Sequence, residues 1–222
     1  LLIQRELIHA DETTCQVLRE EGKAAESISY MWIYLSGNDG LPPIILYDYQ
    51  AGRAGKYAQQ FLEGFHGMLQ CDGYQGYNKV DNVLLVCCLA HCRRKFYEAI
   101  PAERRKKLKL LDINSEEEIK EPLLPKKEEI PSMIPAEVGL AYCNKLFFFE
   151  KQFRDLTPEE RKDRRLETEV PVWVLWSSFF VTLVAKKIVL INLCCRPCFI
   201  WGSITIITVW TNMIIINVCK FF

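Results

Sequence analysis

The chain has 222 residues, of which half are hydrophobic and a quarter charged, and its 28 basic and 28 acidic residues give a formal net charge of zero. This length allows one large domain or two small ones, with enough apolar residues for a real core. The charge balance excludes a uniformly basic nucleic-acid binder, so any contact with DNA must use local patches.

Residues 7–50 predict consecutive β-strands. The first run passes from Leu7 through Asp11 to Leu18, and residues 29–35 and 44–49 are rich in the aromatic and β-branched residues that strands prefer. Gly22 and a turn cluster after the second run separate them. Such a meander predicts antiparallel strands at one side of a mixed sheet.

After the meander the pattern alternates between helix and strand. Residues 54–65 have helical spacing, residues 68–71 form a short strand, and residues 74–80 fit a brief helix. The fully apolar run 83–88 predicts a buried central strand, and residues 90–100 predict an amphipathic helix. Three strands followed by helix, strand, helix, strand and helix give an α/β fold class, with the core in residues 1–100.

Residues 101–179 predict a mainly helical, highly charged region. Residues 115–129 combine acidic and basic runs with prolines and predict a solvated loop. An apolar stripe predicts a helix over residues 136–154. Thr157, Pro158 and Glu160 predict the N-cap, the first residue and the capping-box acid of another helix.

The apolar tail, residues 180–222, differs from the rest of the chain. Every acid lies at or before Glu169, and the four basic residues beyond it leave 24 basic against 28 acidic residues, a net charge of −4, in residues 1–169. Residues 197–219 carry no charge and are long enough to span a bilayer. The tail could be a membrane anchor, a buried strand-rich segment, or an aberrant terminus such as translation beyond a frameshift in AT-rich DNA. The AT-rich-codon composition favours the third interpretation.

The ten cysteines do not predict a secreted disulfide scaffold, because several lie inside apolar runs where free cysteine packs as a small hydrophobe. The first residues become charged at once and do not resemble a signal peptide. The expected location is therefore cytoplasmic and reducing, with a membrane location through the tail as the alternative.

Two aspartates are the first candidates for chemistry. Asp11 and Asp72 each lie at or near the end of a short apolar run that predicts a strand. Two carboxylates that converge repel each other unless a cation neutralises them, so a divalent-metal site for phosphoryl transfer is one hypothesis. The alternative is that both aspartates cap turns.

Seven short motifs occur in one order over roughly residues 5–179, and together they closely resemble bacterial transposases of the kind named insertion sequence sixty-six. The motifs are His9-Ala10-Asp11-Glu12-Thr13, Ser29-Tyr30-Met31-Trp32, Pro43-Ile44-Ile45-Leu46-Tyr47-Asp48-Tyr49, Arg53-Ala54-Gly55, Cys71-Asp72-Gly73-Tyr74-Gln75-Gly76-Tyr77-Asn78, Ala90-His91-Cys92-Arg93-Arg94-Lys95-Phe96 and Leu156-Thr157-Pro158-Glu159-Glu160-Arg161. The resemblance implies a ribonuclease-H-like mixed sheet flanked by helices, with a helical insertion.

The resemblance also implies a DDE-type strand-transfer site that uses Mg²⁺ or Mn²⁺. It makes Asp11 the first catalytic acid and metal ligand and Asp72 the second, with DNA, as transposon ends and target, for a partner and a homo-oligomer as one allowed assembly. The family's third acid is a glutamate on a late helix, and no residue here matches it. The chain is therefore expected to be a truncated, weakly active or inactive core, and the alternative is a non-enzymatic membrane-anchored protein.

Other polar residues are candidates for the same site. His91, Arg93 and Arg94 follow a predicted strand at a helix start and could contact DNA phosphates, although a salt-bridged helix face explains them equally well. Asp48 ends a predicted strand, and a turn role is expected for it. Glu12 should point to the opposite face from Asp11 by strand alternation, so it is left out of the predicted site.

Overall fold

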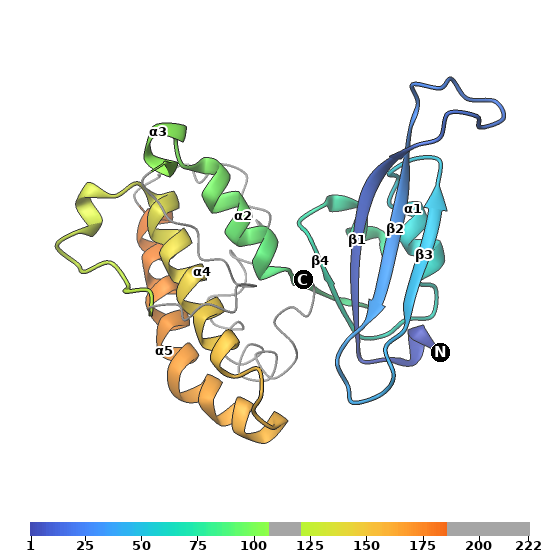
Figure 1. The fold of residues 1–222 in the computed structure, drawn as a ribbon. Coiled ribbons are helices and arrows are strands. Elements are labelled where there is room, and N and C mark those ends of the chain that lie inside the picture. The colour runs from blue at the N-terminus through green and yellow to red at the C-terminus, as the bar shows by residue number, and fades with distance from the viewer. Residues whose placement is uncertain (107–120, 186–222) are drawn as a thin grey trace. The chain divides into compact units, whose positions relative to one another are not determined.

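The structure of the chain is a computed structural model that describes residues 1–106 and 121–185 (Figure 1). The chain divides into two compact units, Leu1–Cys88 and Leu89–Phe222, which are described separately. The predicted membrane segment 197–219 lies outside the described residues. Within the described ranges, no helix is both long enough and apolar enough to cross a bilayer.

The first unit is built on a mixed β-sheet. Its described residues form five strands in the order β3-β2-β1-β4-β5. The strands are β1 (Leu7–Gln16), β2 (Ile28–Ser36), β3 (Ile45–Gln50), β4 (Met68–Cys71) and β5 (Leu84–Cys87). β1, β2 and β3 are antiparallel, whereas β4 and β5 run parallel to β1. The predicted meander and the α/β class are confirmed, and the arrangement is compatible with the ribonuclease-H-like expectation.

The prediction that residues 83–88 form a central strand is wrong for the described sheet. β5 is an edge strand of this sheet, because among the described strands it pairs with β4 alone. Its residue Leu84 is about half exposed. The central strand is β1, whose alternating pattern is less apolar. An apolar run indicates that both faces of a strand are buried. It does not indicate which position the strand takes in the sheet order.

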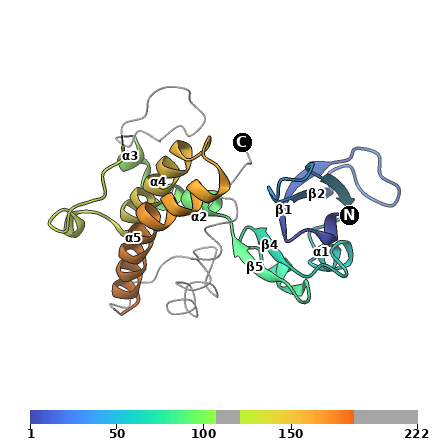
Figure 2. The same cartoon turned by 90° about the horizontal axis from the view of Figure 1, so that it is seen from below.

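One face of the sheet carries the core of this unit. Ile8 and Ala10 of β1 lie on the same face as Trp32 and Tyr34 of β2, because Ala10 pairs with Tyr34 and alternate residues share a face. The helix α1 (Lys56–Phe61) covers this face (Figure 2), and the Tyr34 ring stacks on the Phe61 ring with centroids 4.0 Å apart.

Of the two helices predicted in this unit, one is shorter and the other more tightly wound than its sequence pattern predicts. α1 has six residues instead of the twelve predicted, since Gly64 adopts φ +80 and turns the chain toward β4. The brief helix predicted at residues 74–80 is a 3₁₀ helix, η2 (Gln75–Lys79). A further 3₁₀ helix, η1 (Leu2–Gln4), precedes β1.

The second unit is helical in its described residues. Its elements are α2 (Leu89–Ala99), α3 (Ala102–Arg105), the 3₁₀ helix η3 (Ile130–Ser132), α4 (Pro135–Gln152) and α5 (Pro158–Ala185). α2 approaches α4 closely at Gly139, where an added Cβ would lie 2.3 Å from the Phe96 ring. Trp176 of α5 closes the core by stacking on Tyr142, with ring centroids 6.1 Å apart.

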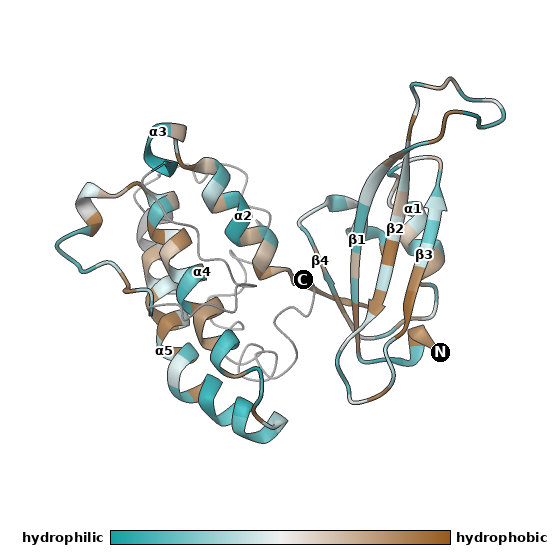
Figure 3. Ribbon diagram, in the orientation of Figure 1, coloured by the Kyte–Doolittle hydropathy of each residue, from teal (hydrophilic) through white to brown (hydrophobic). Residues whose placement is uncertain are grey.

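The start of α5 confirms its predicted cap. The Thr157 side-chain oxygen accepts a hydrogen bond from the Glu160 backbone N–H at 3.3 Å, and the Glu160 carboxylate accepts one from the Thr157 backbone N–H at 3.0 Å. These bonds hold the pKa of Glu160 below its usual value. The first turns of α5 are hydrophilic and its later turns apolar (Figure 3), as the change in composition after Glu169 predicts.

Candidate active site at the ends of β1 and β4

Asp11 and Asp72 occupy matching positions on two adjacent parallel strands. The last paired residues of β1 and β4 are His9 and Gln70, and each aspartate lies two residues further along its strand. β4 ends at Cys71, so Asp72 is the first residue beyond it, whereas β1 continues past Asp11. Because parallel strands share direction and spacing, the backbone brings both acids to the same edge of the sheet.

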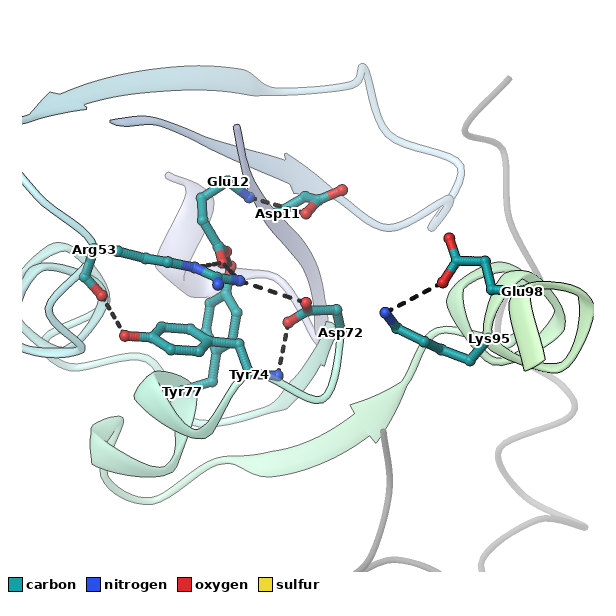
Figure 4. Close-up of polar contacts among 8 residues, drawn as sticks. All are labelled: Asp11, Glu12, Arg53, Asp72, Tyr74, Tyr77, Lys95 and Glu98. Atoms are coloured by element: carbon teal, nitrogen blue, oxygen red, sulfur yellow. Dashed lines mark hydrogen bonds and ion pairs between the residues drawn. The ribbon is translucent and has the colours of Figure 1, made fainter. Parts of the chain in front are cut away.

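Asp11 is exposed and lies on the face of β1 opposite the core. Its Oδ1 accepts a hydrogen bond from the backbone N–H of Glu12 at 2.9 Å. In Figure 4 the Asp11 carboxylate points away from Arg53, whereas the Glu12 side chain points toward Arg53. The Asp11 side chain is therefore at the surface, on the side away from the Glu12–Arg53 pair.

Asp72 is partly buried, with 20% of its side chain exposed. Its Oδ1 accepts a hydrogen bond from the backbone N–H of Tyr74 at 2.8 Å, and its Oδ2 lies 3.7 Å from Nη2 of Arg53. The first contact is the turn cap of the alternative hypothesis. It also fixes the direction of the carboxylate, so the turn role and a ligand role are compatible.

Glu12 is the residue that sequence reasoning left out. The prediction that its side chain points away from Asp11 is confirmed. On the inner face of the sheet, however, Arg53 links the Glu12 side chain to Asp72. Its side chain is 1% exposed, and its Oε1 accepts from Nε of Arg53 at 2.7 Å and lies 2.5 Å from Nη2. Its Oε2 accepts from the Tyr77 hydroxyl at 2.5 Å. Arg53 thus bridges Glu12 and Asp72.

Protonation in this cluster follows from burial. Burial raises the pKa of Glu12 above its usual value, and the nearby charge of Asp72 adds to the rise, while the bonds from Tyr77 and Arg53 oppose it. Burial and the carboxylate of Glu12 also raise the pKa of Tyr77 far above its usual value. Both shifts favour a Tyr77 hydroxyl that keeps its proton and donates its hydrogen bond to Glu12.

The loop that carries Arg53 is tied to the chain that follows β4. The guanidinium carbon lies 4.0 Å from the centroid of the Tyr74 ring, and the Tyr74 hydroxyl donates to the Arg53 carbonyl oxygen (Figure 4). Two residues on, Gly55 packs directly against Gly76 of η2, where an added Cβ would lie 2.3 Å from the Gly76 carbonyl oxygen. These contacts hold Arg53 beside Asp72.

The donor chemistry at this edge suits a hard cation only in part. Carboxylate oxygens are the ligands that Mg²⁺ prefers, and Asp11 and Asp72 present two of them. In residues 1–106 and 121–185, no group of three or more histidine, cysteine, aspartate or glutamate side chains is placed to hold a metal ion. The described residues therefore bring the two predicted acids, Asp11 and Asp72, to this edge, and a metal site there stays a prediction.

The basic residues predicted to contact DNA lie on α2, in the second unit. Arg93 donates from Nε to Oδ1 of Asn144 at 2.7 Å, and its guanidinium carbon lies 5.5 Å from the centroid of the Phe147 ring. It therefore packs α2 against α4. His91 is half-buried and Arg94 is exposed. A phosphate contact through these residues stays a prediction, and Arg94 has the most accessible side chain of the set.

Asp48 does not lie at a strand end. It is inside β3, two strands from β1 in the sheet order, and pairs with Trp32. Its carboxylate accepts from Nε2 of Gln50 at 2.9 Å. The expected turn role is therefore wrong, because β3 continues through Gln50.

Comparison with known proteins supports the resemblance that the seven motifs indicate. A family model described as "Transposase IS66 family" matches residues 1–181. The uncharacterized protein y4qI of Sinorhizobium fredii (strain NBRC 101917 / NGR234) is 32% identical over 107 residues, which are 42% of this chain and 20% of that protein. The uncharacterized protein y4hP of the same organism is 26% identical over 179 residues, which are 76% of this chain and 29% of that protein.

The chain spans less than a third of the length of these two relatives, because the matched parts are 20% and 29% of them. No solved structure matches the chain. The matched family region ends at residue 181, inside α5 and before the apolar segment 197–219.

Proposed function

The chain belongs to the IS66 family of transposases, and from this membership we propose that it serves DNA transposition by metal-dependent phosphoryl transfer at Asp11 and Asp72. The proposed partner is DNA, both as transposon ends and as target. The family match covers residues 1–181 and so includes both acids together with Glu12 and Arg53.

One observation carries this proposal. Asp11 and Asp72 lie at matching positions of the parallel pair β1 and β4, two residues beyond the pairing of His9 with Gln70. Strands hold side chains in fixed directions, so this pairing is a rigid way to bring two carboxylates from distant parts of a sequence to one edge.

The chain's own residues have separate roles in this proposal. Asp11 offers an accessible carboxylate, and Asp72 offers one whose direction is set by the Tyr74 backbone. Arg53 and Glu12 balance charge beside Asp72. A divalent cation bound by the two aspartates would supply the positive charge that activates a nucleophile and stabilises the leaving oxygen of the phosphodiester.

Binding of Mn²⁺ to the full chain tests the proposed pair. Electron paramagnetic resonance of free Mn²⁺ measures the affinity of the wild-type chain and of the D11N and D72N variants. Each variant removes one anionic ligand with little change of shape, so each is expected to weaken binding by at least about tenfold, the scale on which even outer-shell changes act. The double variant is expected to bind no more tightly than the weaker single variant.

The D48N variant is the matched control for this experiment. Asp48 is also a strand aspartate of the first unit, and an asparagine can still accept from Gln50. Its Mn²⁺ affinity is expected to equal that of the wild type. Equal Mn²⁺ affinity of wild type, D11N and D72N would contradict the proposed site.

A further inference from the structure

The guanidinium of Arg53 has a use beyond the neutralisation of Glu12. We propose that Arg53 binds a phosphate of the DNA backbone beside Asp72 through its Nη1. This inference rests on the proposed function, since it gives the DNA a specific contact at the predicted catalytic edge. Arg53 lies in one of the seven motifs, but the resemblance assigned it no role, and the proposal makes it a positioning residue.

Arg53 has more N–H donors than its contacts with Glu12 and Asp72 use. A guanidinium carries five N–H groups and no acceptor. Nε and Nη2 are directed at Glu12, and Nη2 also faces Asp72. Nη1 makes no hydrogen bond to any residue that the structure describes, and the side chain is 40% exposed. Two donors are therefore open to a ligand from solvent.

The Arg53 side chain is held in place by its neighbours. The buried carboxylate of Glu12 holds one edge of the guanidinium, and the Tyr74 ring lies 4.0 Å from its carbon. Glu12 is itself fixed by the Tyr77 hydroxyl. An arginine that is already ordered loses less side-chain entropy when it binds, and guanidinium geometry suits phosphate oxygens.

The charge around Arg53 is mostly negative. Asp11, Glu12 and Asp72 are three acids within one edge of the sheet, and a DNA phosphate approaching them is repelled. Arg53 is the cation that contacts two of these acids among the described residues. The positive charge of Arg53 beside Asp72 offsets this repulsion, so its exposed guanidinium can hold a phosphodiester there.

DNA binding as a function of salt measures this contact. A fluorescein-labelled DNA duplex of arbitrary sequence is titrated with the full chain, and fluorescence anisotropy is followed from 50 to 200 mM NaCl. Loss of one phosphate contact lowers the slope of log affinity against log salt by about 0.9. The R53Q variant is therefore expected to bind more weakly than the wild type, with an affinity ratio that shrinks about 3.5-fold over this salt range.

Two further variants separate a phosphate contact from a purely structural role. The R53Q change leaves Glu12 buried without its partner, which destabilises the fold. The E12Q/R53Q variant removes both charges and keeps an acceptor for Tyr77, so it restores a neutral core. The proposal expects this double variant to bind DNA as weakly as R53Q, with the same reduced slope. R53K keeps the charge and is expected to keep the wild-type slope.

The R19Q variant controls for net charge. Arg19 is an exposed arginine in the loop between β1 and β2, and its removal changes the net charge of the first unit as R53Q does. Its slope is expected to equal that of the wild type. The proposal is overturned if E12Q/R53Q binds like the wild type, if R19Q lowers the slope as much as R53Q, or if the wild-type chain does not bind the duplex.

These outcomes are independent of the proposed metal site. Failure of D11N and D72N to weaken Mn²⁺ binding would remove the catalytic proposal and leave a changed slope in R53Q as evidence for DNA contact. Normal Mn²⁺ results with an unchanged slope in both R53Q and E12Q/R53Q would remove the Arg53 contact alone.

Discussion

The position of Arg53 depends on a residue with no side chain, Gly55. An added Cβ would lie 2.3 Å from the backbone oxygen of Gly76, and a backbone atom cannot move aside as a flexible side chain can. The close approach of the two glycines is what brings the Arg53 loop against the chain that follows Asp72. A single methyl group at this position therefore acts on the site through the backbone.

Gly55→Ala is expected to destabilise the chain by about 1–3 kcal/mol, the usual cost of forcing extra volume into a packed position. Urea denaturation measures the change in the free energy of unfolding. Gly52→Ala is the matched control, because the nearest atom to its added Cβ is in Tyr57 at 4.0 Å, an ordinary contact. An equal effect of both substitutions would show that loss of glycine entropy, and not the contact with Gly76, sets the cost.

Between the helices α4 and α5, a buried polar group replaces apolar packing. Arg165 is 2% exposed and donates from Nε and Nη2 to the Glu150 carboxylate, at 2.5 and 2.7 Å. Glu169 is 1% exposed and lies in the same group. Burial, followed by the neighbouring charge of Glu150, raises the pKa of Glu169 well above its usual value, and Arg165 only partly opposes this.

The sign of the resulting pH dependence follows from linkage. A raised pKa means that the folded chain binds more protons than the unfolded chain between the two pKa values, so the free energy of unfolding falls as pH rises through that window. The E169Q variant lacks this proton. We expect the wild type to lose stability relative to E169Q as pH rises from the ordinary glutamate pKa to the raised one, by at most about 1.4 kcal/mol per pH unit.

Urea denaturation of both chains at a series of pH values measures this difference. E167Q is the control, since Glu167 lies on the exposed side of the same helix, paired with Arg164 at 3.2 Å. Its stability is expected to stay within about 0.5 kcal/mol of the wild type. Parallel stability curves for wild type and E169Q would show that Glu169 is not protonated in the folded chain.

For the molecule as a whole, we expect the number of acids at the predicted site to limit activity. The described residues bring Asp11 and Asp72 to one edge, and they place no group of three or more histidine, cysteine, aspartate or glutamate side chains to hold a metal ion. We expect at most trace Mg²⁺-dependent nicking of supercoiled plasmid DNA by this chain, because two ligands hold a metal ion loosely. Robust nicking that Asp11→Ala abolishes would contradict this expectation.

Much of the architecture was predictable from local pattern. β4 was predicted residue for residue at Met68–Cys71, because an apolar run between turn residues defines a short strand. The cap at Thr157 was predicted because its hydrogen bonds join residues three apart. The family motifs directed attention to both aspartates, and their register on β1 and β4 agrees with that choice.

Contacts between distant residues were not predictable in this way. Glu12 and Arg53 are separated by 41 positions, and no periodicity links them. The alternation of side chains along β1 correctly predicts that Glu12 faces inward. Its partner on that face, Arg53, comes from the loop before α1, which the strand pattern does not place. The edge position of β5 was missed for the same reason, since strand order is decided by pairing partners and not by the run itself.

The pairing of β1 with β4 also sets an order of events when the chain folds. β1, β2 and β3 are joined by short connections and pair with their sequence neighbours, whereas β4 pairs with β1 across about 60 residues. Long-range parallel pairing requires the larger loss of chain entropy, so it is slow compared with hairpin closure. On the ribosome, the three strands of the meander leave the exit tunnel before β4 does, because they precede it in the chain. We therefore expect the predicted catalytic edge to be completed after the meander, when β4 docks.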